Sequence, residues 1–351
     1  MQNAKRVYIV SIRRACAAKD TLTVPVIDWE NICQAAECGD VQDVKILLDK
    51  GIDVNMEDRS DFTPLHWAAR CNPNVEVAKF LIVKGADINA IHDYSSTPFS
   101  LAVDKKNLEV VELLISEGAD VHAGGTLHKA AFRGDFELVK LLVSKGADVN
   151  AKNEDGNTPL HEASFQGIEI TQFLLFEGAD VHAKNKYGST PLNSIFVSNE
   201  VRRSLVAHGA DVNAKDEDGN TPLHKVANLF YSVEKAEFLI SNGSDVNAKN
   251  NKGLTPLHRV RCVNMAQILV SKGADVHAKD ERGRTPLHTA GEYDAEIAQF
   301  LVSKGAVVNA KDNDGKTPLD TQKTEVNAIG AKKIVEYLES IEAQSGEDLD
   351  D

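Results

Sequence analysis

The sequence predicts an all-α protein in which short helix-turn-helix units stack side by side as a solenoid. Two repeated segments and one turn signal support this prediction. The tetrapeptide Thr-Pro-Leu-His recurs along the chain, with degenerate copies between the clear ones, at spacings of 28 to 34 residues. A Gly-Ala-Asp-Val-Asn segment follows most copies, and Asp-Gly turns often precede the next copy. Clear copies start at Thr63, Thr158, Thr221, Thr255 and Thr285, and degenerate ones at Thr97, Gly125, Thr190 and Thr317.

Each piece of one unit has a physical reason. Thr158 has a hydroxyl that can cap a helix, and Pro159 suits the first helical position because its missing N–H costs nothing there. Glu169–Phe176 is then a second helix, whose apolar residues cover a broad arc. Gly178 ends that helix, since glycine readily adopts the left-handed conformation. One such pair cannot bury its apolar faces alone, so neighbouring units must cover them.

The repeats divide the chain into three parts. Residues 28–340 form the repeat domain of about ten units, in which 28–55 and 317–340 are cap-like because they depart from the repeat. Residues 1–27 are an extension that carries basic residues, and it is either a packed or flexible arm or a targeting signal. Residues 341–351 are an acidic tail that we expect to be disordered.

The period near 33 residues, Thr-Pro-Leu-His-x-Ala and Gly-Ala-Asp-Val-Asn-Ala-Lys together resemble the ankyrin repeat. The resemblance implies helix-turn-helix units joined by β-hairpin turns, with no catalytic role. It also implies that a partner protein binds in a concave groove formed by the turn tips and the exposed side of the first helices. The near-identical units further resemble those of ankyrin proteins from intracellular bacteria and some protists.

Several units depart from the pattern. Between His122 and Gly125 the turn has lost about five residues, which predicts a truncated finger. Links between helices are short at Asn193–Arg202 and Arg259–Met265, and long at Arg70–Val75 and Asn228–Val233. These changes are either tolerated variation in surface loops or the shaping of a binding surface.

Composition narrows the functions. A net charge of −14 disfavours nucleic-acid binding and suits a partner with a basic surface. No apolar run is long enough to span a membrane, and five cysteines without a C-x-x-C pair argue against a disulfide framework or a zinc site. The repeat distributes the histidines one per layer, where the resemblance gives them hydrogen-bonding roles. We therefore expect no cofactor, no metal, no catalytic residues, a monomer, and a cytoplasmic protein unless it is delivered into a host cell.

Candidate partner-binding residues are aromatic, arginine and neighbouring side chains that replace the consensus on the turn tips and first helices, because aromatics and arginines dominate binding energy at interfaces. The tip residues are Arg59, Phe62, Tyr94, Tyr187, Leu254, Arg282 and Arg284. The first-helix residues are Trp67, Arg70, Phe132, Arg133, Phe165, Gln166, Arg261 and Tyr293. Trp67, Phe132 and Phe165 have an equally plausible role in packing between layers.

The function that these observations predict is a non-catalytic scaffold for protein–protein interaction. One alternative is an inhibitor or immunity factor that directly blocks an enzyme or toxin. Another is an effector that acts on host proteins.

Overall fold

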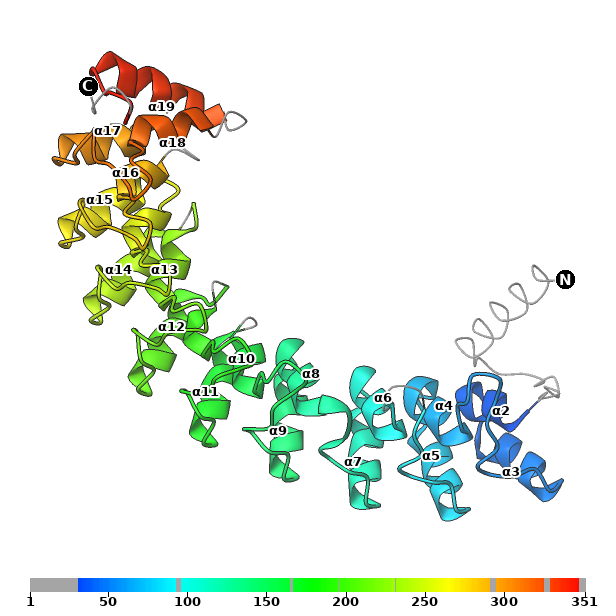
Figure 1. The fold of residues 1–351 in the computed structure, drawn as a ribbon. Helices are drawn as coiled ribbons and strands as arrows, with labels where there is room; N and C mark the ends of the chain where they lie inside the picture. Colours follow the sequence, from blue (N-terminus) through cyan, green and yellow to red (C-terminus); the bar gives the residue numbers. More distant parts are fainter. Residues whose placement is uncertain are drawn as a thin grey trace, which may run out of the picture. The chain divides into compact units, whose positions relative to one another are not determined.

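The computed structural model describes residues 31–92, 96–164, 167–194, 196–230, 232–290, 295–324 and 329–346. The chain divides into two compact units, Met1–Ala151 and Lys152–Asp351. Both units consist of the predicted helix pairs, so each is a stack of repeats with its own continuous core (Figure 1).

The first unit contains four helix pairs in its described residues. In each pair a first helix that carries the tetrapeptide, or its equivalent, leads into a second helix of nine residues. The pairs are α2 (Ile32–Cys38) with α3 (Val41–Asp49), α4 (Pro64–Cys71) with α5 (Val75–Val83), α6 (Pro98–Asp104) with α7 (Leu108–Ser116), and α8 (Thr126–Phe132) with α9 (Phe136–Ser144).

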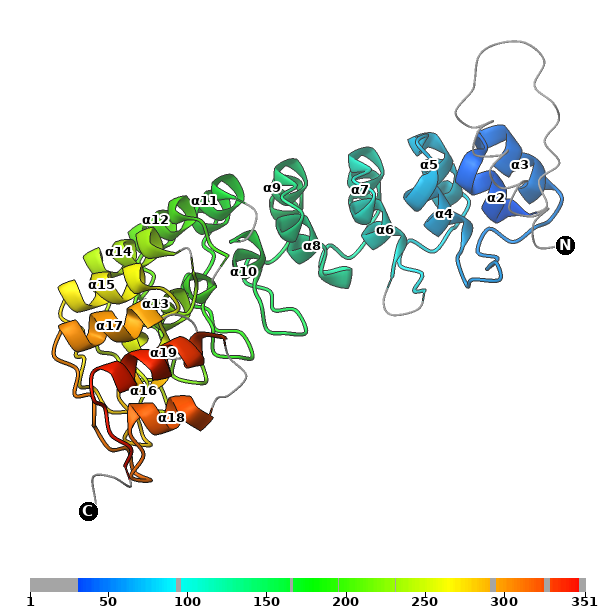
Figure 2. The ribbon, with the colours of Figure 1, turned by 90° about the horizontal axis from the view of Figure 1, so that it is seen from above.

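The second unit continues the same pattern with six pairs in its described residues. They are α10 (Pro159–Ala163) with α11 (Ile168–Phe176), η3 (Pro191–Asn193) with α12 (Asn199–Ala207), α13 (Pro222–Ala227) with α14 (Val233–Ser241), η4 (Pro256–Arg259) with α15 (Val263–Ser271), α16 (Pro286–Thr289) with α17 (Ala295–Ser303), and α18 (Pro318–Thr324) with α19 (Ile329–Ser340). Within each unit the first helices form one row and the second helices another (Figure 2).

The core of each unit lies between these two rows. The leucine of the tetrapeptide is fully buried, as Leu65, Leu160 and Leu223 show, and so are second-helix leucines such as Leu81 and Leu239. Burying a leucine side chain contributes about 1.5–3 kcal/mol relative to leaving it exposed. Helices of adjacent pairs contact one another, α2 with α4 and α14 with α15 for example, so adjacent repeats stabilise each other, as in other one-dimensional folds.

The shortened links have a structural counterpart. At Asn193–Arg202 and Arg259–Met265 the first α-helix is replaced by the 3-10 turns η3 and η4. The loss of length falls on the first helix: residues 194–198 still separate η3 from α12, and residues 260–262 separate η4 from α15, as residues 72–74 separate α4 from α5. The second helices α12 and α15 keep nine residues.

The connecting turns differ from the expected hairpins. Within the described residues their only β pairing is one isolated bridge, between His92 and Ser96, and no strand forms. The truncated turn is confirmed: the chain passes through η2 (Ala123–Gly125) directly into α8. Gly124 and Gly125 both have positive φ, at 65° and 60°, which explains why glycine occupies both positions.

Residues 341–346, the first part of the predicted tail, make hydrogen bonds to residues 317–320. Thr317 Oγ donates to the carbonyl of Gln344 at 2.9 Å, and the N–H of Gly346 donates to Asp320 at 2.7 Å. Residues 341–346 therefore contact the repeat that contains α18. The predicted extension 1–27 and the remainder of the tail, 347–351, lie outside the described residues.

Candidate protein-binding surface

The connecting turns of the second unit are held by their own side chains. Asn185 Oδ1 accepts the N–H groups of Tyr187 and Ser189, at 2.9 and 3.0 Å. Asp216 and Asn250 make equivalent bonds in the next two turns. Since a side chain closes each turn, the tip residue projects from a fixed backbone, and Tyr187 is accordingly 62 % exposed.

Successive turns are also bonded to one another. In the second unit a backbone N–H of each turn donates to a carbonyl of the turn before it, at 2.8 to 3.0 Å. The bonds join Lys186 to Asp155, Glu217 to Tyr187, Asn251 to Asp218, Glu281 to Lys252, and Asn313 to Arg282. The tips of this unit therefore form one hydrogen-bonded row.

Lysine side chains reinforce the row at its base. The ammonium groups of Lys152, Lys184, Lys215 and Lys249 each donate to the backbone carbonyl of the lysine in the following turn, the last being Lys279, at 2.8 to 2.9 Å. The recurring Asn-Ala-Lys segment thus has a structural role in this unit, which the sequence pattern alone did not reveal.

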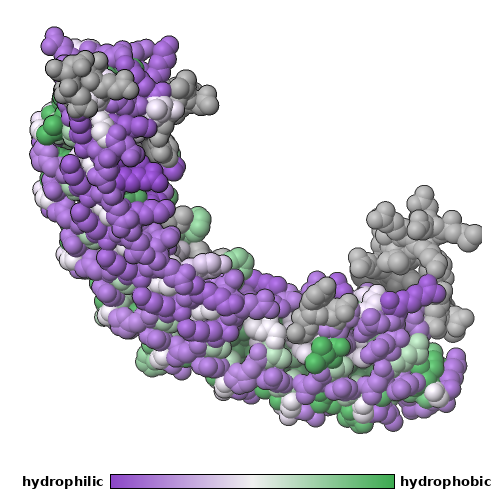
Figure 3. Space-filling view, in the orientation of Figure 1, coloured by the Kyte–Doolittle hydropathy of each residue, from purple (hydrophilic) through white to green (hydrophobic). Residues whose placement is uncertain are grey.

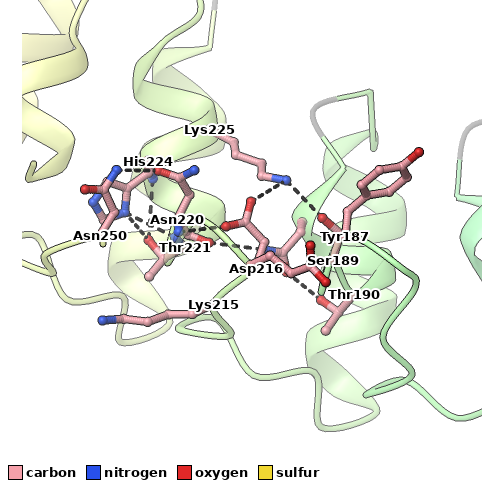
Figure 4. Close-up of polar contacts among 12 residues, drawn as sticks. Tyr187, Ser189, Thr190, Lys215, Asp216, Asn220, Thr221, His224, Lys225 and Asn250 are labelled. Carbon is pink, nitrogen blue, oxygen red and sulfur yellow. Dashed lines mark hydrogen bonds and ion pairs between the residues drawn. The ribbon is translucent and has the colours of Figure 1, made fainter. Parts of the chain in front are cut away.

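A polar network connects the row of turns to the first helices (Figure 4). Lys225 of α13 forms an ion pair with Asp216 at 2.9 Å and donates to Ser189 Oγ at 3.0 Å. The carboxylate of Asp216 is almost completely buried in this pair. Asn250 donates to Asn220 Oδ1 at 2.8 Å, which carries the network into the following turn.

The tetrapeptide histidines have the expected structural role. In His66, His161, His224, His258 and His288 the ring Nδ1 lies 2.8 to 3.0 Å from the hydroxyl of the threonine three residues earlier. The same Nδ1 accepts the backbone N–H of that threonine, and Nε2 lies 2.9 to 3.4 Å from a carbonyl before the next first helix. These contacts assign a neutral ring with the proton on Nε2.

Burial reinforces that neutral state. Desolvation lowers the pKa of His224 to about 4, and it also lowers the pKa of His66, His258 and His288. At neutral pH each of these rings is an uncharged bridge between repeats. Among the described residues no three histidine, cysteine or carboxylate side chains are grouped so that they could hold a metal ion.

The candidate partner-binding residues fall into four groups. Arg59, Phe132, Arg133, Tyr187 and Arg282 are exposed. Trp67, Arg70, Leu254, Arg261 and Arg284 are half-buried, and Tyr94, Phe165, Gln166 and Tyr293 lie outside the described residues. Phe62 forms the fourth group, because it is buried.

The expectation that Phe62 is an exposed tip residue is wrong. Its side chain is 8 % exposed, and its ring packs at 5.3 Å from His66, 5.3 Å from Trp67 and 4.1 Å from His92. The turn before α4 folds Phe62 inward because Asp58 Oδ1 accepts its N–H. Phe62 therefore supports the surface and does not itself present one.

Some arginines on this surface already have partners within the chain. Arg133 donates to the carboxylate of Asp104 at 3.0 Å, and Arg284 donates to the buried carboxylate of Asp280 at 2.8 to 2.9 Å. Arg261 Nε donates to Asn228 Oδ1 at 2.9 Å. These side chains are ordered by the fold, and a partner has to compete with those contacts to use their charge.

Among the described residues outside the second helices, sequence reasoning missed two exposed aromatics, Phe196 and Phe230, which are 70 % and 47 % exposed. Both lie in links between helices of the second unit, at the end of a first helix or of the 3-10 turn that replaces it. The only signal was their place in links of unusual length. The visible face of this unit is mostly hydrophilic (Figure 3).

A depression of about 590 Å³ lies between α11 and α12. It is lined by Ile168, Gln172, Glu200, Arg203, Ser204, Ala207 and His208. These residues belong to second helices, so the depression is separate from the row of turn tips.

The fold and these contacts define a helical repeat protein, and comparison with known sequences identifies its family. A profile of ankyrin repeats in three copies matches residues 32–124, 99–185, 127–216, 162–250, 195–280 and 260–345. The overlapping matches cover most of the chain, which therefore belongs to the ankyrin-repeat family. Ankyrin repeats generally mediate protein–protein interaction, and the fold is typically a non-enzymatic scaffold.

Curated relatives are similar only over short segments. Alpha-latrocrustotoxin-Lt1a of Latrodectus tredecimguttatus is 46 % identical over 72 residues, which are 20 % of this chain and 5 % of the toxin. Serine/threonine-protein kinase 12 of Arabidopsis thaliana is 39 % identical over 70 residues, which are 20 % of this chain and 15 % of the kinase. Palmitoyltransferase ZDHHC13 of Mus musculus is 36 % identical over 95 residues, 26 % of this chain and 15 % of that enzyme. The chain thus spans only 5 to 15 % of these relatives.

The fold of this chain is also similar to that of a solved ankyrin-repeat structure. The ankyrin repeat domain of human ASB11 has a TM-score of 0.54 and 25 % sequence identity, over 62 % of this chain and 99 % of that one.

In the described part of the chain, none of the helices combines the length and the apolar composition needed to cross a membrane.

Proposed function

We propose that this chain is a non-catalytic scaffold that binds a partner protein through its turn tips and the exposed side of its first helices. The observation that carries the proposal is the hydrogen-bonded row of turns in the second unit. A row that is fixed before binding loses little conformational entropy when a partner docks. The exposed tip residues Tyr187 and Arg282 are of the types that contribute most at interfaces.

The test compares two variants of the full chain. The tip variant combines Arg59→Ala, Tyr187→Ala and Arg282→Ala. The control variant combines Val83→Ala and Phe176→Ala, which remove exposed apolar groups, 74 % and 84 % exposed, from second helices. Proteins captured by the wild-type chain from its native cell are identified by mass spectrometry, and each is then purified and titrated against all three chains.

We expect the tip variant to bind the partner at least tenfold more weakly, while the control variant keeps the affinity of the wild-type chain. The unfolding midpoints of both variants should stay close to that of the wild-type chain. Equal loss in the two variants would place the binding surface on the second helices. If the partner is an enzyme or toxin, its activity in the presence of the wild-type chain tests the alternative role as an inhibitor.

A further inference from the structure

The first unit holds a pair of aromatic rings in a fixed position at the start of the repeat array. The indole Nε1 of Trp67 donates to Asp58 Oδ2 at 2.8 Å. Asp58 is itself fixed, because its Oδ1 accepts the N–H groups of Ser60 and Phe62, at 2.7 and 3.2 Å. The buried ring of Phe62 supports the half-buried indole of Trp67, with ring centroids 5.3 Å apart.

Arg70 lies over these rings at the end of α4. Its guanidinium carbon is 5.4 Å from the ring centroid of Trp67 and 5.7 Å from that of Phe62. Stacking occupies a face of the guanidinium and leaves the N–H groups at its edge available. Within the described residues Arg70 makes no hydrogen bond and no ion pair, although its side chain is half-buried.

Other candidate arginines differ from Arg70 because their guanidinium groups are bonded to carboxylates of the same chain. Arg133 and Arg284 have their edges bonded to the carboxylates of Asp104 and Asp280. Those two arginines are neutralised within the fold. Arg70 is held by stacking, and none of the described acidic residues forms an ion pair with it.

We propose that Arg70, held on the rings of Phe62 and Trp67, binds a carboxylate side chain of the partner protein. The proposal rests on the function proposed above and specifies the partner's chemistry at one point: an aspartate or glutamate on the docking segment. A planar guanidinium binds a carboxylate through two parallel hydrogen bonds, and the fixed rings remove much of the entropy cost of positioning it.

The charges around Arg70 favour a carboxylate over a phosphate group. The turn before α4 carries Glu57, Asp58 and Asp61, and the whole chain has a net charge of −14. A phosphate group of nearly two negative charges would be repelled more strongly than a carboxylate of one. Phosphate recognition in proteins also generally uses clusters of arginines, whereas the only other arginine in that turn is Arg59.

The experiment uses a phage-displayed library of random peptides, selected on the full chain. Trp67 reports binding directly: the chain has two tryptophans, so Trp29→Phe leaves Trp67 as the only fluorescent indole. Each selected peptide is synthesised in three versions. In the first the acidic residue is kept, in the second it is replaced by its amide, asparagine or glutamine, and in the third it is replaced by phosphoserine. Each is titrated against wild type, Arg70→Gln, Arg70→Lys, the tip variant and the control Arg203→Gln, which changes an exposed arginine of second helix α12.

We expect peptides that alter Trp67 fluorescence to share an acidic residue. Replacing it by the amide weakens binding to the wild-type chain by about tenfold or more, since charge-assisted hydrogen bonds are the strong ones. The same replacement changes binding to Arg70→Gln by less than about twofold, which a general loss of folding would not produce. Arg203→Gln keeps the wild-type preference, and Arg70→Lys loses most of it because lysine lacks the planar edge.

Three results would overturn the inference: selected peptides without acidic residues, an equal amide effect in wild type and Arg70→Gln, or tighter binding of the phosphoserine peptides. If the selected peptides bind the tip variant more weakly than the wild-type chain in any of these three cases, the proposed function stands without Arg70. If no peptide is selected, or if neither variant weakens binding, both proposals fail.

Discussion

At the scale of single residues, Arg202 is the clearest departure from what the repeat requires. Its side chain on α12 is fully buried, and it makes one hydrogen bond, from Nη2 to the carbonyl of Ser194 at 3.2 Å. Its Nε and Nη1 atoms have no hydrogen-bond partner in the described part of the chain. Desolvation lowers its pKa to about 10 and no carboxylate offsets that effect, so this position carries an energetic cost.

Replacing this arginine tests that cost. Arg202→Met keeps the side chain long and removes the buried charge, so we expect the free energy of unfolding in urea to rise by about 1–4 kcal/mol. Arg203→Met, at the exposed neighbouring position, is the control and should change it by less than about 0.5 kcal/mol. A loss of stability in Arg202→Met would show that the guanidinium stabilises the fold after all.

The sequence predicted some residues correctly and others wrongly for identifiable reasons. The histidines of the tetrapeptide were predictable because their partners lie three residues earlier and one repeat later. Phe62 was not, because the direction of its ring depends on how Asp58 closes the turn. Phe196 and Phe230 were missed because their exposure depends on the path of two irregular links.

At the scale of single elements, the connecting turns show why particular glycines are required. A Cβ on Gly253, where φ is +71°, would lie 2.8 Å from the backbone nitrogen of Glu281 in the next turn. Gly243, at φ +92°, ends α14, and a Cβ on it would meet no other atom within 4 Å. Both glycines adopt a backbone conformation that other residues disfavour, but only Gly253 is also confined by its neighbour.

This difference gives a matched pair of substitutions. Gly243→Ala introduces only the backbone strain, about 1–3 kcal/mol. Gly253→Ala adds a clash with a hydrogen-bonded backbone, for which we expect about a further 1–3 kcal/mol. Chemical denaturation of both variants measures the difference, and equal losses would mean that the next turn yields easily to the added methyl group.

The elements also show the limits of the repeat pattern. The sequence predicted the second helices, whose apolar residues recur at helical spacing. It did not predict that two first helices contract to the 3-10 turns η3 and η4, because the tetrapeptide there remains nearly intact. The loss of length falls on the first helix and leaves the second helices α12 and α15 at nine residues.

At the scale of the whole molecule, the neutral histidines make stability depend on pH. His66 belongs to the first unit, and His224, His258 and His288 belong to the second. Burial lowers the pKa of each below the ordinary value of 6.5. The unfolded chain therefore binds protons on these rings that the folded chain does not bind.

We expect the stability from these groups to be fully present above about pH 6.5 and to fall as the pH drops toward 4. For His224 alone, the lowering of the pKa from 6.5 to about 4 corresponds to a loss of about 3 kcal/mol in the free energy of unfolding on full acidification. Thermal unfolding followed by circular dichroism between pH 7.5 and about 4 measures the fall. His224→Gln should unfold at a lower temperature at neutral pH but lose less on acidification; an unchanged slope would assign the pH dependence to other groups.

The amino-acid sequence by itself determined the family, the period and the order of the helix pairs. It could do so because capping, helix termination and the neutral histidine bridges depend on residues a few positions apart or one repeat apart. Only the tertiary structure decided that Phe62 is buried and that Arg70 stacks on its ring. It also decided that, among the described residues, Arg202 has no counter-charge and the edge of Arg70 has no hydrogen-bond partner. Those outcomes depend on how side chains from several turns and helices meet, which a repeated pattern does not specify.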